Sequence, residues 1–412
     1  MDDKGKGDGN GKGGGTRMDV ERRKLIKAVG VTAASAGIGV LLPSCRRGKR
    51  SEGRGTRVNG IDRIARATDK GEKEDPVHGR YYRADDDGFA HCELCFHECR
   101  ISQGGAGFCR NRVNRKGRLY NIVYNRPSSV AVDPTEKEPL HHFFPATDML
   151  CIGTASCNLR CKFCQNWELS QRDFEEMIIR YSLTPEEIVA AAKRAKVVAI
   201  SYTYNEPAVF YEYMYDIAVE GRKAGLRSIM HSNGGMKSKP LAGVLPHIDA
   251  ATIDLKAFNP EYYKEICRGE LEPVLETLKA INADDGTWLE IVNLVLPGHN
   301  DSPEEIRKMC GWIMKNLGPD VPMHFSRFFP AHAMRNLSPT PISTLERARA
   351  IAMEEGLNYV AIGNVPGHDA NSTYCPKCKT RVIRRHHFKV LNVNMKDGAC
   401  GKCGNAIPGV WG

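Results

Sequence analysis

Three absences narrow the field before any motif is considered. No long hydrophobic run is present, because the mildly apolar stretch 28–42 has only fifteen residues and is too short to cross a bilayer comfortably. No internal repeat or low-complexity tract interrupts the central part of the chain, so a repeat architecture is not indicated. The basic stretch 381–389 has no interleaved aromatic platform, which favours a solvated hairpin over a nucleic-acid-binding surface.

Acidic residues are scarce at both ends of the chain, and this accounts for its net charge of +10. Residues 1–60 contain 14 Lys and Arg against 6 Asp and Glu, and residues 375–412 contain 8 against 1. The rest of the chain therefore carries about −5. Since the excess positive charge belongs to the two ends, it says nothing about what the central part binds.

The 15 cysteines are not evenly scattered, as they would be in a disulfide framework, and 11 of them fall in three tight groups. The groups are Cys92, Cys95, Cys99 and Cys109; Cys157, Cys161 and Cys164; and Cys375, Cys378, Cys400 and Cys403. Cysteine pairs separated by two residues indicate metal or cluster binding in a reducing compartment. Cys45 and Cys267 lack such spacing, while Cys151 and Cys310 lie in apolar runs where a small buried side chain is the expected role.

The middle group lies on one tight loop, Cys157 to Cys164, directly after the apolar run 149–153. A cubane iron–sulfur cluster has four irons and normally takes four thiolates. Three thiolates leave one iron without a protein ligand, and an open position on a metal is where a substrate or cofactor binds. We therefore interpret this loop as the reactive centre. The alternative is a zinc or disulfide site with a fourth ligand elsewhere.

The N-terminal part of the chain has no core-forming pattern. Residues 1–15 are rich in glycine and charge, and we expect them to be disordered. Arg22 and Arg23 precede the apolar stretch 28–42, an order typical of a twin-arginine export signal. A basic tail leading into an amphipathic helix is the alternative. The polar, Gly- and Arg-rich residues 46–88 are predicted to be a disordered linker.

The first cysteine group predicts a compact metal-binding knuckle. Its spacing, C-x2-C-x3-C-x9-C, can hold one tetrahedral metal, because a C-x2-C turn directs both sulfurs to one side. A structural zinc is the simpler interpretation, and an auxiliary iron–sulfur cluster is the alternative. Residues 118–123 and 130–133 then alternate in polarity like short strands that lead into the central part of the chain.

From residue 149 the pattern alternates between strands and helices. Apolar runs at 149–153, 197–202, 227–232, 250–255, 288–296, 323–328 and 359–363 predict strands. Thr184 and Ser302 each begin a capping box followed by proline, and Gly225 and Gly356 end helices. Strands that are buried on both faces indicate a parallel α/β sheet. Six or seven units fall short of a closed barrel, so we predict a partial (β/α)6-type TIM barrel.

Polar residues follow successive strands, at the end of a parallel sheet where active sites form. The segments are 157–164, 203–207, 231–235, 254–256, 296–298, 324–327 and 363–367. Each segment alone is a weak signal, since Asn-Gly, for example, is more often a turn. The ordered set predicts that these side chains converge on one mouth.

The last cysteine group has the spacing of a zinc ribbon. Cys375-x2-Cys378 and Cys400-x2-Cys403 are two knuckles that can clamp one tetrahedral zinc. The predicted domains are residues 1–45 (signal-like segment), 46–88 (linker), 89–148 (Cys-rich knuckle and lead-in strands), 149–367 (partial barrel) and 368–412 (zinc-ribbon-like module).

C-x3-C-x2-C after the first strand of a partial barrel, with Phe163 before the last cysteine, resembles the radical S-adenosylmethionine (SAM) superfamily. Residues from about 89 to 412 are similar to the AmmeMemoRadiSam-system enzymes, relatives of the pyruvate formate-lyase activating enzymes. The supporting segments are 92–95, 107–109, 133–134, 138–140, 157–167, 203–207, 254–256, 324–328 and 375–403. Phe96 departs from the subgroup, which usually has proline there.

The resemblance implies a cofactor site. Cys157, Cys161 and Cys164 would hold a 4Fe–4S cluster whose open iron binds SAM, and one electron would cleave SAM to a 5′-deoxyadenosyl radical that abstracts hydrogen. The implied SAM-binding roles are Glu206 toward the amino group, Lys256 toward the carboxylate, Asn233 and Asp254 toward the ribose and Phe163 toward the adenine. His324 and Arg327 are candidates for contact with the substrate.

Two enzyme functions and one binding function follow as expectations. The first is a radical SAM enzyme acting on a protein or peptide, with an electron donor such as flavodoxin or ferredoxin and Memo- or AMMECR-type partners. The second is a glycyl-radical-enzyme activating enzyme, and the third is a zinc-ribbon nucleic-acid adaptor with a structural cluster. The signal-like segment would bring the chain to the membrane, yet SAM and low-potential electrons are cytoplasmic supplies, so the chemistry favours the cytoplasm.

Overall fold

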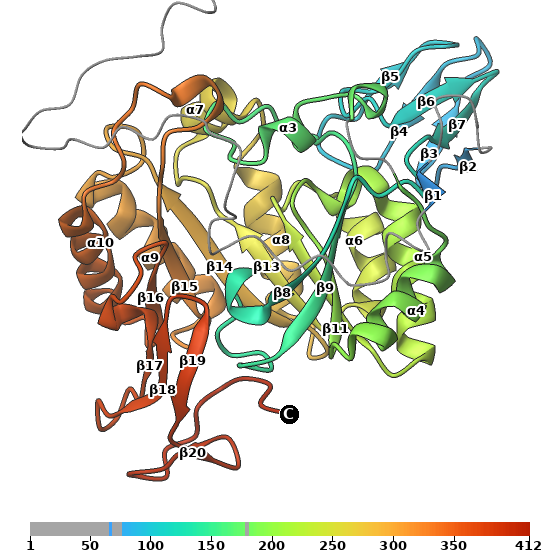
Figure 1. The fold of residues 1–412 in the computed structure, drawn as a ribbon. Coiled ribbons are helices and arrows are strands. Elements are labelled where there is room, and N and C mark those ends of the chain that lie inside the picture. Colours follow the sequence, from blue (N-terminus) through green and yellow to red (C-terminus); the bar gives the residue numbers. More distant parts are fainter. Residues whose placement is uncertain (1–65, 68–75, 178–180) are drawn as a thin grey trace, which may run out of the picture. The chain divides into compact units, whose positions relative to one another are not determined.

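The computed structural model describes residues 66–67, 76–177 and 181–412 (Figure 1). The signal-like segment 1–45 and most of the linker 46–88 lie outside these residues.

An eight-stranded sheet forms the centre of the described chain, in the order β16-β15-β14-β13-β12-β11-β9-β8. Its strands are β8 (Ser129–Pro134), β9 (Asp148–Gly153), β11 (Ala199–Tyr202), β12 (Arg227–Ser232), β13 (Ala250–Asp254), β14 (Trp288–Val295), β15 (Met323–Arg327) and β16 (Val360–Gly363). All pairs from β9 to β16 are parallel, and β8 runs antiparallel to β9. The predicted α/β class is confirmed.

The sheet has two open edges rather than a closed ring of strands. Among the described strands, β8 and β16 stand at opposite ends of the sheet order. The parallel strands pair in chain order, as expected for a partial barrel. The sheet nevertheless begins one strand earlier than predicted, because 129–134 pairs along its whole length with β9 instead of leading into the barrel.

Helices connect the parallel strands (Figure 1). They are α3 (Trp167–Ser170), α4 (Pro185–Ala195), α5 (Tyr211–Lys223), α6 (Ser238–Val244), α7 (Pro260–Tyr262), α8 (Glu272–Asn282), α9 (Pro303–Leu317) and α10 (Ile342–Glu354). A π-helical turn, Tyr263–Cys267, continues α7. Helices α4, α5, α8 and α10 pack against the strands, whose residues are mostly buried.

The two predicted capping boxes differ in the structure. At α4, the Thr184 hydroxyl accepts from the backbone N–H of Glu187, and the Glu187 carboxylate accepts from the backbone N–H of Thr184. At α9, Ser302 accepts from the N–H of Glu305, but the Glu305 carboxylate accepts from the N–H of Phe258 instead. The second box is therefore only half formed, because Glu305 connects the helix to the loop after β13.

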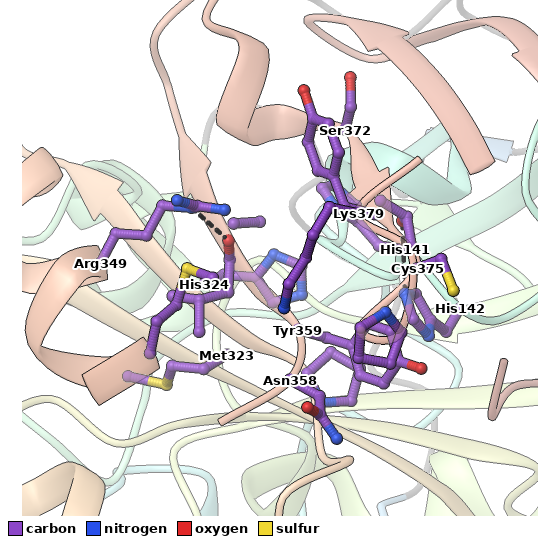
Figure 2. A pocket seen from close by; sticks show the side chains of 17 residues that line it. His141, His142, Met323, His324, Arg349, Asn358, Tyr359, Ser372, Cys375 and Lys379 are labelled. Carbon is purple, nitrogen blue, oxygen red and sulfur yellow. Dashed lines mark hydrogen bonds between the residues drawn. The ribbon is translucent and has the colours of Figure 1, made fainter. Parts of the chain in front are cut away.

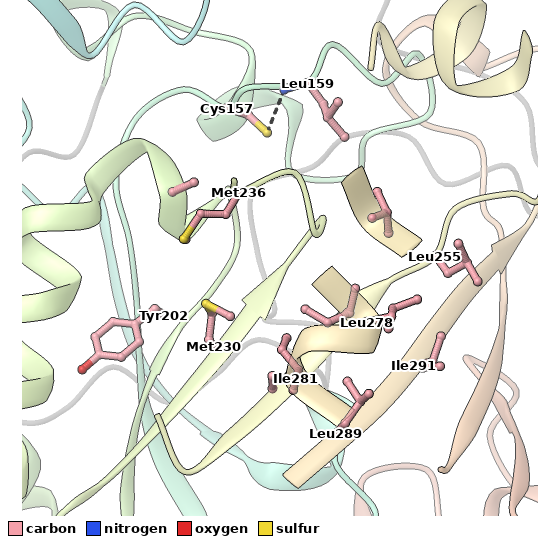
Figure 3. Packing of buried hydrophobic residues seen from close by; sticks show 14 of the residues in the cluster. Cys157, Leu159, Tyr202, Met230, Met236, Leu255, Leu278, Ile281, Leu289 and Ile291 are labelled. Carbon is pink, nitrogen blue, oxygen red and sulfur yellow. Dashed lines mark hydrogen bonds between the residues drawn. The ribbon is translucent and has the colours of Figure 1, made fainter. Parts of the chain in front are cut away.

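The largest apolar cluster extends from the sheet to the cysteine loop. Figure 3 shows Met230 of β12 and Ile291 of β14 packing with Leu278 of α8. Cys157 and Leu159 belong to the same cluster. Each fully buried side chain of this size contributes about 1.5–3 kcal/mol, so the loop is held by the same core that holds the sheet.

Short antiparallel strands form the N-terminal knuckle. They are β2 (Val77–His78), β3 (Tyr82–Ala84), β4 (Ala90–Cys92), β5 (Arg100–Ile101), β6 (Arg112–Arg115) and β7 (Arg118–Asn121). The prediction of a linker to residue 88 is wrong for residues 77–84, which form β2 and β3 and pair with β7 and β4. A further short strand, β1 (Arg66–Ala67), pairs with β10 (Tyr181–Ser182). These residues therefore belong to small antiparallel sheets and not to a linker.

The knuckle contacts the turn after β12. The N–H of Phe96 donates to the carbonyl of Gly235 at 3.2 Å, and the N–H of Lys237 donates to the carbonyl of Leu94 at 3.0 Å. A Cβ on Gly235 would lie 2.6 Å from the Phe96 ring, so only glycine allows this approach. Proline at position 96 would remove the first of these bonds.

The C-terminal module is a set of short antiparallel strands. They are β17 (Thr373–Tyr374), β18 (Arg381–His386), β19 (Lys389–Val393), β20 (Met395–Lys396) and β21 (Ala399–Cys400). Val410 pairs with the segment before β9, since its N–H donates to the carbonyl of His142 and its carbonyl accepts from the N–H of Phe144, both at 2.7 Å. The end of the module is thereby joined to residues 142–144.

Candidate functional site

One large cavity opens at the carboxyl ends of the parallel strands, with a volume of about 600 Å³. Figure 1 shows α3 and α7, which follow β9 and β13, at this end of the sheet. The predicted site residues on its wall are Cys157, Cys161, Phe163, Cys164, Asn233, Asp254, Lys256 and His324. Side chains from successive strands therefore converge as the sequence predicts, in a cavity of the size that holds small molecules.

The three loop cysteines face this cavity from one side. Burial raises the pKa of Cys157, and it raises the pKa of Cys164 to about 11. A hydrogen bond with Cys267, followed by burial, raises the pKa of Cys161. No three sulfurs of the group lie within 4.8 Å of one another. These thiols are thus protonated and too widely set to share one ion.

Hydrogen bonds from backbone and side-chain groups hold the loop. The N–H of Leu159 donates to the Cys157 sulfur at 3.3 Å, and the hydroxyl of Ser170 lies 3.1 Å from the Cys164 sulfur. The N–H of Arg160 donates to the carbonyl of Cys267 at 2.8 Å. Hydrogen bonds to sulfur are a means by which proteins stabilise bound thiolates and tune cluster potentials.

Glu206 lies behind the cavity wall. It is fully buried, and its carboxylate accepts from the hydroxyl of Ser232 at 2.9 Å and from the N–H groups of Asn233 and Ala208 at 2.8 and 3.1 Å. Glu206 therefore fixes the turn that carries Asn233. Its expected contact with the SAM amino group stays a prediction, because protein donors occupy both of its oxygens.

Asp254 and Lys256 form a charged pair on the cavity wall, with Nζ to Oδ2 at 2.9 Å. His231 Nε2 lies 3.4 Å from the other oxygen of Asp254. Burial would raise the pKa of Asp254, but Lys256 and then His231 outweigh it and hold this pKa below its usual range. Lys256 Nζ also lies 5.8 Å from the centre of the Phe163 ring. The pair is charged and preorganised.

Glu138 is a cavity residue to which the sequence assigned no role. Burial raises its pKa to about 7, against the opposing effects of His231 and a hydrogen bond from Ser201. His231 Nδ1 lies 3.8 Å from the Glu138 carboxylate, so His231 stands between two acids. A carboxyl group with a pKa near 7 can exchange a proton at physiological pH. The only sequence signal was the segment 138–140 in the family resemblance.

His324 and Arg327, the two substrate-side candidates, lie in different places. His324 is on the cavity wall, and its Nε2 donates to Glu290 at 2.6 Å. Arg327 is not among the residues lining the cavity; its Nε donates to the carbonyl of Thr340 at 2.8 Å, and its guanidinium lies over Phe329. The structure therefore brings only His324 to the mouth.

A buried polar cluster behind His324 connects the barrel to the C-terminal module. Glu290 also accepts from the N–H groups of His141 and His142. Arg385 of β18 donates to the carbonyl of His141 at 2.6 Å. Figure 2 shows His141, His142 and His324 around a pocket that Cys375 also lines. The module thereby supports the wall that carries His324.

The four cysteines of the C-terminal module meet at one point. Their sulfurs all lie within 4.8 Å of one another, with Cys375 to Cys403 at 3.7 Å and Cys378 to Cys400 at 3.6 Å. A tetrahedral zinc with bonds of 2.3 Å holds its sulfurs about 3.8 Å apart. Hydrogen bonds from Thr380 lower the pKa of Cys378 to about 6. The donor set fits zinc, as the ribbon spacing predicts.

The comparisons with known proteins agree with this site. The model of the radical SAM superfamily matches residues 151–310, which include the cysteine loop and the cavity strands β11 to β14. The α/β fold and the cysteine loop are those of a radical SAM enzyme, and the chain belongs to this superfamily.

A particular relative is an uncharacterized protein of Methanocaldococcus jannaschii, 44% identical over 329 residues that cover 79% of this chain and 97% of the relative. The chain belongs to the same family. It is also similar to a domain of pyruvate-formate lyase-activating enzyme from Bacteroides vulgatus (16% identity, TM-score 0.36, 40% of this chain and 99% of that one). A radical SAM methyltransferase from Sphaerobacter thermophilus is similar too (16% identity, TM-score 0.43, 54% and 68%).

Among the residues that the structure describes, no helix has the combination of length and apolar character that crossing a bilayer needs.

Proposed function

We propose that this protein uses a 4Fe–4S cluster on Cys157, Cys161 and Cys164 to cleave SAM and to abstract hydrogen from a protein or peptide substrate. The observation that carries this proposal is the placement of three cysteines of one loop on the wall of the same cavity as Asp254 and Lys256. A cluster with an open iron and charged side chains that bind SAM are the two parts that the reaction needs.

The donor set fits such a cluster. Three thiols are soft ligands, their sulfurs are spaced more widely than ligands of a single ion, and Leu159 N–H already donates to one of them. The raised pKa values of these thiols mean that binding releases protons, as is usual for thiolate sites. When bound, the cluster supplies one electron for cleavage of the sulfonium C–S bond, which yields methionine and a 5′-deoxyadenosyl radical.

The remaining side chains position SAM. Lys256 pairs with the SAM carboxylate, and Phe163 packs on the adenine. Asp254 accepts hydrogen bonds from the ribose hydroxyls, and Asn233 donates to them. The Asp254–Lys256 pair is held at 2.9 Å before any ligand arrives, so little reorganisation is required on binding. Glu206 supports Asn233 from behind.

The substrate enters from the side of the mouth that carries His324 and Glu138. Glu138, with its pKa of about 7, can hold or release a proton there. We propose an electron donor of the flavodoxin or ferredoxin kind and system partners of the Memo and AMMECR types, on the family resemblance alone.

Anaerobic reconstitution followed by reduction with dithionite in the presence of SAM tests the reaction. We expect 5′-deoxyadenosine and methionine from the native chain and none from Cys161→Ala. Cys310→Ala is the matched control, since Cys310 is also buried but lies in α9, away from the cavity. Absence of 5′-deoxyadenosine from fully reconstituted native protein would refute the enzyme function and leave a structural cluster.

The same assay identifies the substrate class. Candidate proteins are added in turn, and mass spectrometry of each follows the mass change. A glycyl radical formed on a target glycine would replace our proposal with an activating function, whereas a modified partner or peptide supports it.

A further inference from the structure

A second, smaller cavity lies inside the N-terminal knuckle. Its wall carries all four knuckle cysteines, Cys92, Cys95, Cys99 and Cys109. The rest of the wall is mainly apolar, with Leu94 and Phe108 from the knuckle and Ala208 and Val209 from the barrel. The fold does not require four thiols to gather around an apolar cavity, so their arrangement indicates a bound group.

The spacing of these thiols does not suit zinc. No three of the four sulfurs lie within 4.8 Å of one another, whereas the four sulfurs of the C-terminal module do. Sulfurs that share one zinc lie about 3.8 Å apart. A cluster of four irons, in which each thiolate binds a different iron, separates them further. The same chain thus contains one cysteine set arranged for an ion and another arranged for a larger group.

Two buried donors beside this cavity have no hydrogen-bond partner among the described residues. They are Nδ2 of Asn158 and Nε of Arg112, in side chains that are 0% and 1% exposed. Leaving such a donor unsatisfied costs about 1–3 kcal/mol. The thiolate and sulfide sulfurs of a cluster are acceptors at this position. Because the Arg112 charge is already paired with buried Glu212 at 2.7 Å, Arg112 offers the cluster its free N–H and no uncompensated charge.

Asn158 belongs to the catalytic loop itself and directly follows Cys157. Its Oδ1 lies 3.7 Å from the Cys157 sulfur and accepts from Asn233 at 2.7 Å. Its carbonyl accepts from His97 of the knuckle at 2.7 Å, and Arg160 donates to the carbonyl of Phe108 at 2.5 Å. One side chain therefore separates the two cysteine sites, and direct hydrogen bonds fix their distance.

We propose that the knuckle binds a second 4Fe–4S cluster through its four cysteines, and that this cluster passes electrons to the catalytic loop past Asn158. In each transfer the reduced second cluster loses one electron and the cluster on Cys157, Cys161 and Cys164 gains it. A low-potential one-electron donor protein then reduces the second cluster again. The second cluster stands on its own evidence of geometry, whereas the relay rests on the function proposed above.

Metal content of the full chain tests the site. After anaerobic reconstitution, the variant with Cys157, Cys161 and Cys164 replaced by Ala should retain about four irons and four sulfides, half the native content. It should keep one zinc, in the C-terminal module. The matched variant Cys95→Ala/Cys99→Ala should lose the other half and still release 5′-deoxyadenosine when dithionite supplies the electrons. Cys310→Ala should change nothing.

Other metal contents overturn the proposal. A triple variant with no iron and two zincs would make the knuckle a zinc site, and two irons would exclude a four-iron cluster. Loss of 5′-deoxyadenosine in the native chain, with four irons still bound by the triple variant, would refute the proposed function and the relay but leave the second cluster.

Asn158→Leu tests the hydrogen bond and the relay. Loss of an N–H donor to sulfur disfavours the reduced, more negative cluster, so the potential of the knuckle cluster, measured by redox titration with electron paramagnetic resonance in the triple-Ala background, should fall. With a donor protein as reductant, formation of 5′-deoxyadenosine should slow at least tenfold in Asn158→Leu. An unchanged potential would remove Asn158 from the site, and an unchanged rate would refute the relay.

Discussion

Replacing Arg385 by Met should destabilise the protein by about 3–5 kcal/mol, the usual cost of removing one partner of a buried charge pair. The Arg385 side chain is 0% exposed, as is that of Glu136, whose Oε1 lies 3.6 Å from Arg385 Nε. Arg385 also donates to the hydroxyl of Thr373 and the carbonyl of His141, and each bond from a charged donor contributes about 1.5–3 kcal/mol.

The loss should depend on pH. Burial already raises the pKa of Glu136 although Arg385 opposes it, so removing Arg385 raises this folded-state pKa further above its unfolded value. A group with a raised folded pKa contributes stability at low pH and loses it as pH rises. The defect of Arg385→Met should therefore grow between pH 5.5 and pH 8.

Urea unfolding of zinc-loaded protein, followed by circular dichroism, measures the free energy of unfolding. Arg385→Met/Glu136→Gln should be more stable than Arg385→Met at pH 8, because no buried charge is left without its partner. Arg384→Met is the matched control: Arg384 is the exposed neighbour on β18 and should change stability by less than about 0.5 kcal/mol. A defect that does not vary with pH, or a double variant no better than the single one, would refute this explanation.

Three further outcomes are expected. As pH rises from 5 to 8, the free energy of unfolding of Glu138→Gln should increase relative to that of the native chain by up to about 3 kcal/mol. The reason is that ionisation of the Glu138 carboxyl, whose pKa is about 7, destabilises the native chain, whereas glutamine does not ionise. Thermal melts of both proteins at each pH check this. Lys256→Met should weaken SAM binding about 10- to 100-fold in equilibrium titration, the value of a bond to a charged group, while exposed Lys162→Met should not. Cys400→Ser should lose zinc, keep iron and lower the melting temperature of the chain, and retained zinc would contradict the four-cysteine site.

Local patterns were sufficient to predict the main sheet. All seven apolar runs from 149 to 363 form strands, because burial on both faces leaves a continuous apolar signature that needs no partner to be recognised. The edge strand β8 was assigned to the lead-in because its pairing with β9 is a long-range choice. Residues 77–84 were assigned to a linker because their short strands depend on pairing with β4 and β7 rather than on their own composition.

Part of the candidate site could likewise be predicted from local sequence patterns, and part could not. Cysteine spacing and strand ends predicted the residues that now line the cavity, since chain order and sheet order coincide. The sequence did not predict that Glu206 turns behind the wall or that Arg327 bonds to Thr340. It also gave no role to Glu138, because the raised pKa arises from burial among groups that are distant in sequence.

The pairing of Val410 with His142 and Phe144 has a consequence for synthesis. Residues 142–144 leave the ribosome long before Val410, so this contact cannot form until Val410 has also emerged. The parallel strands can assemble one after another as they appear, but the wall that holds Glu290 and His324 must wait for the C-terminal module to fold. A metal held by the four cysteines of this module would then decide when a nascent molecule acquires a finished cavity.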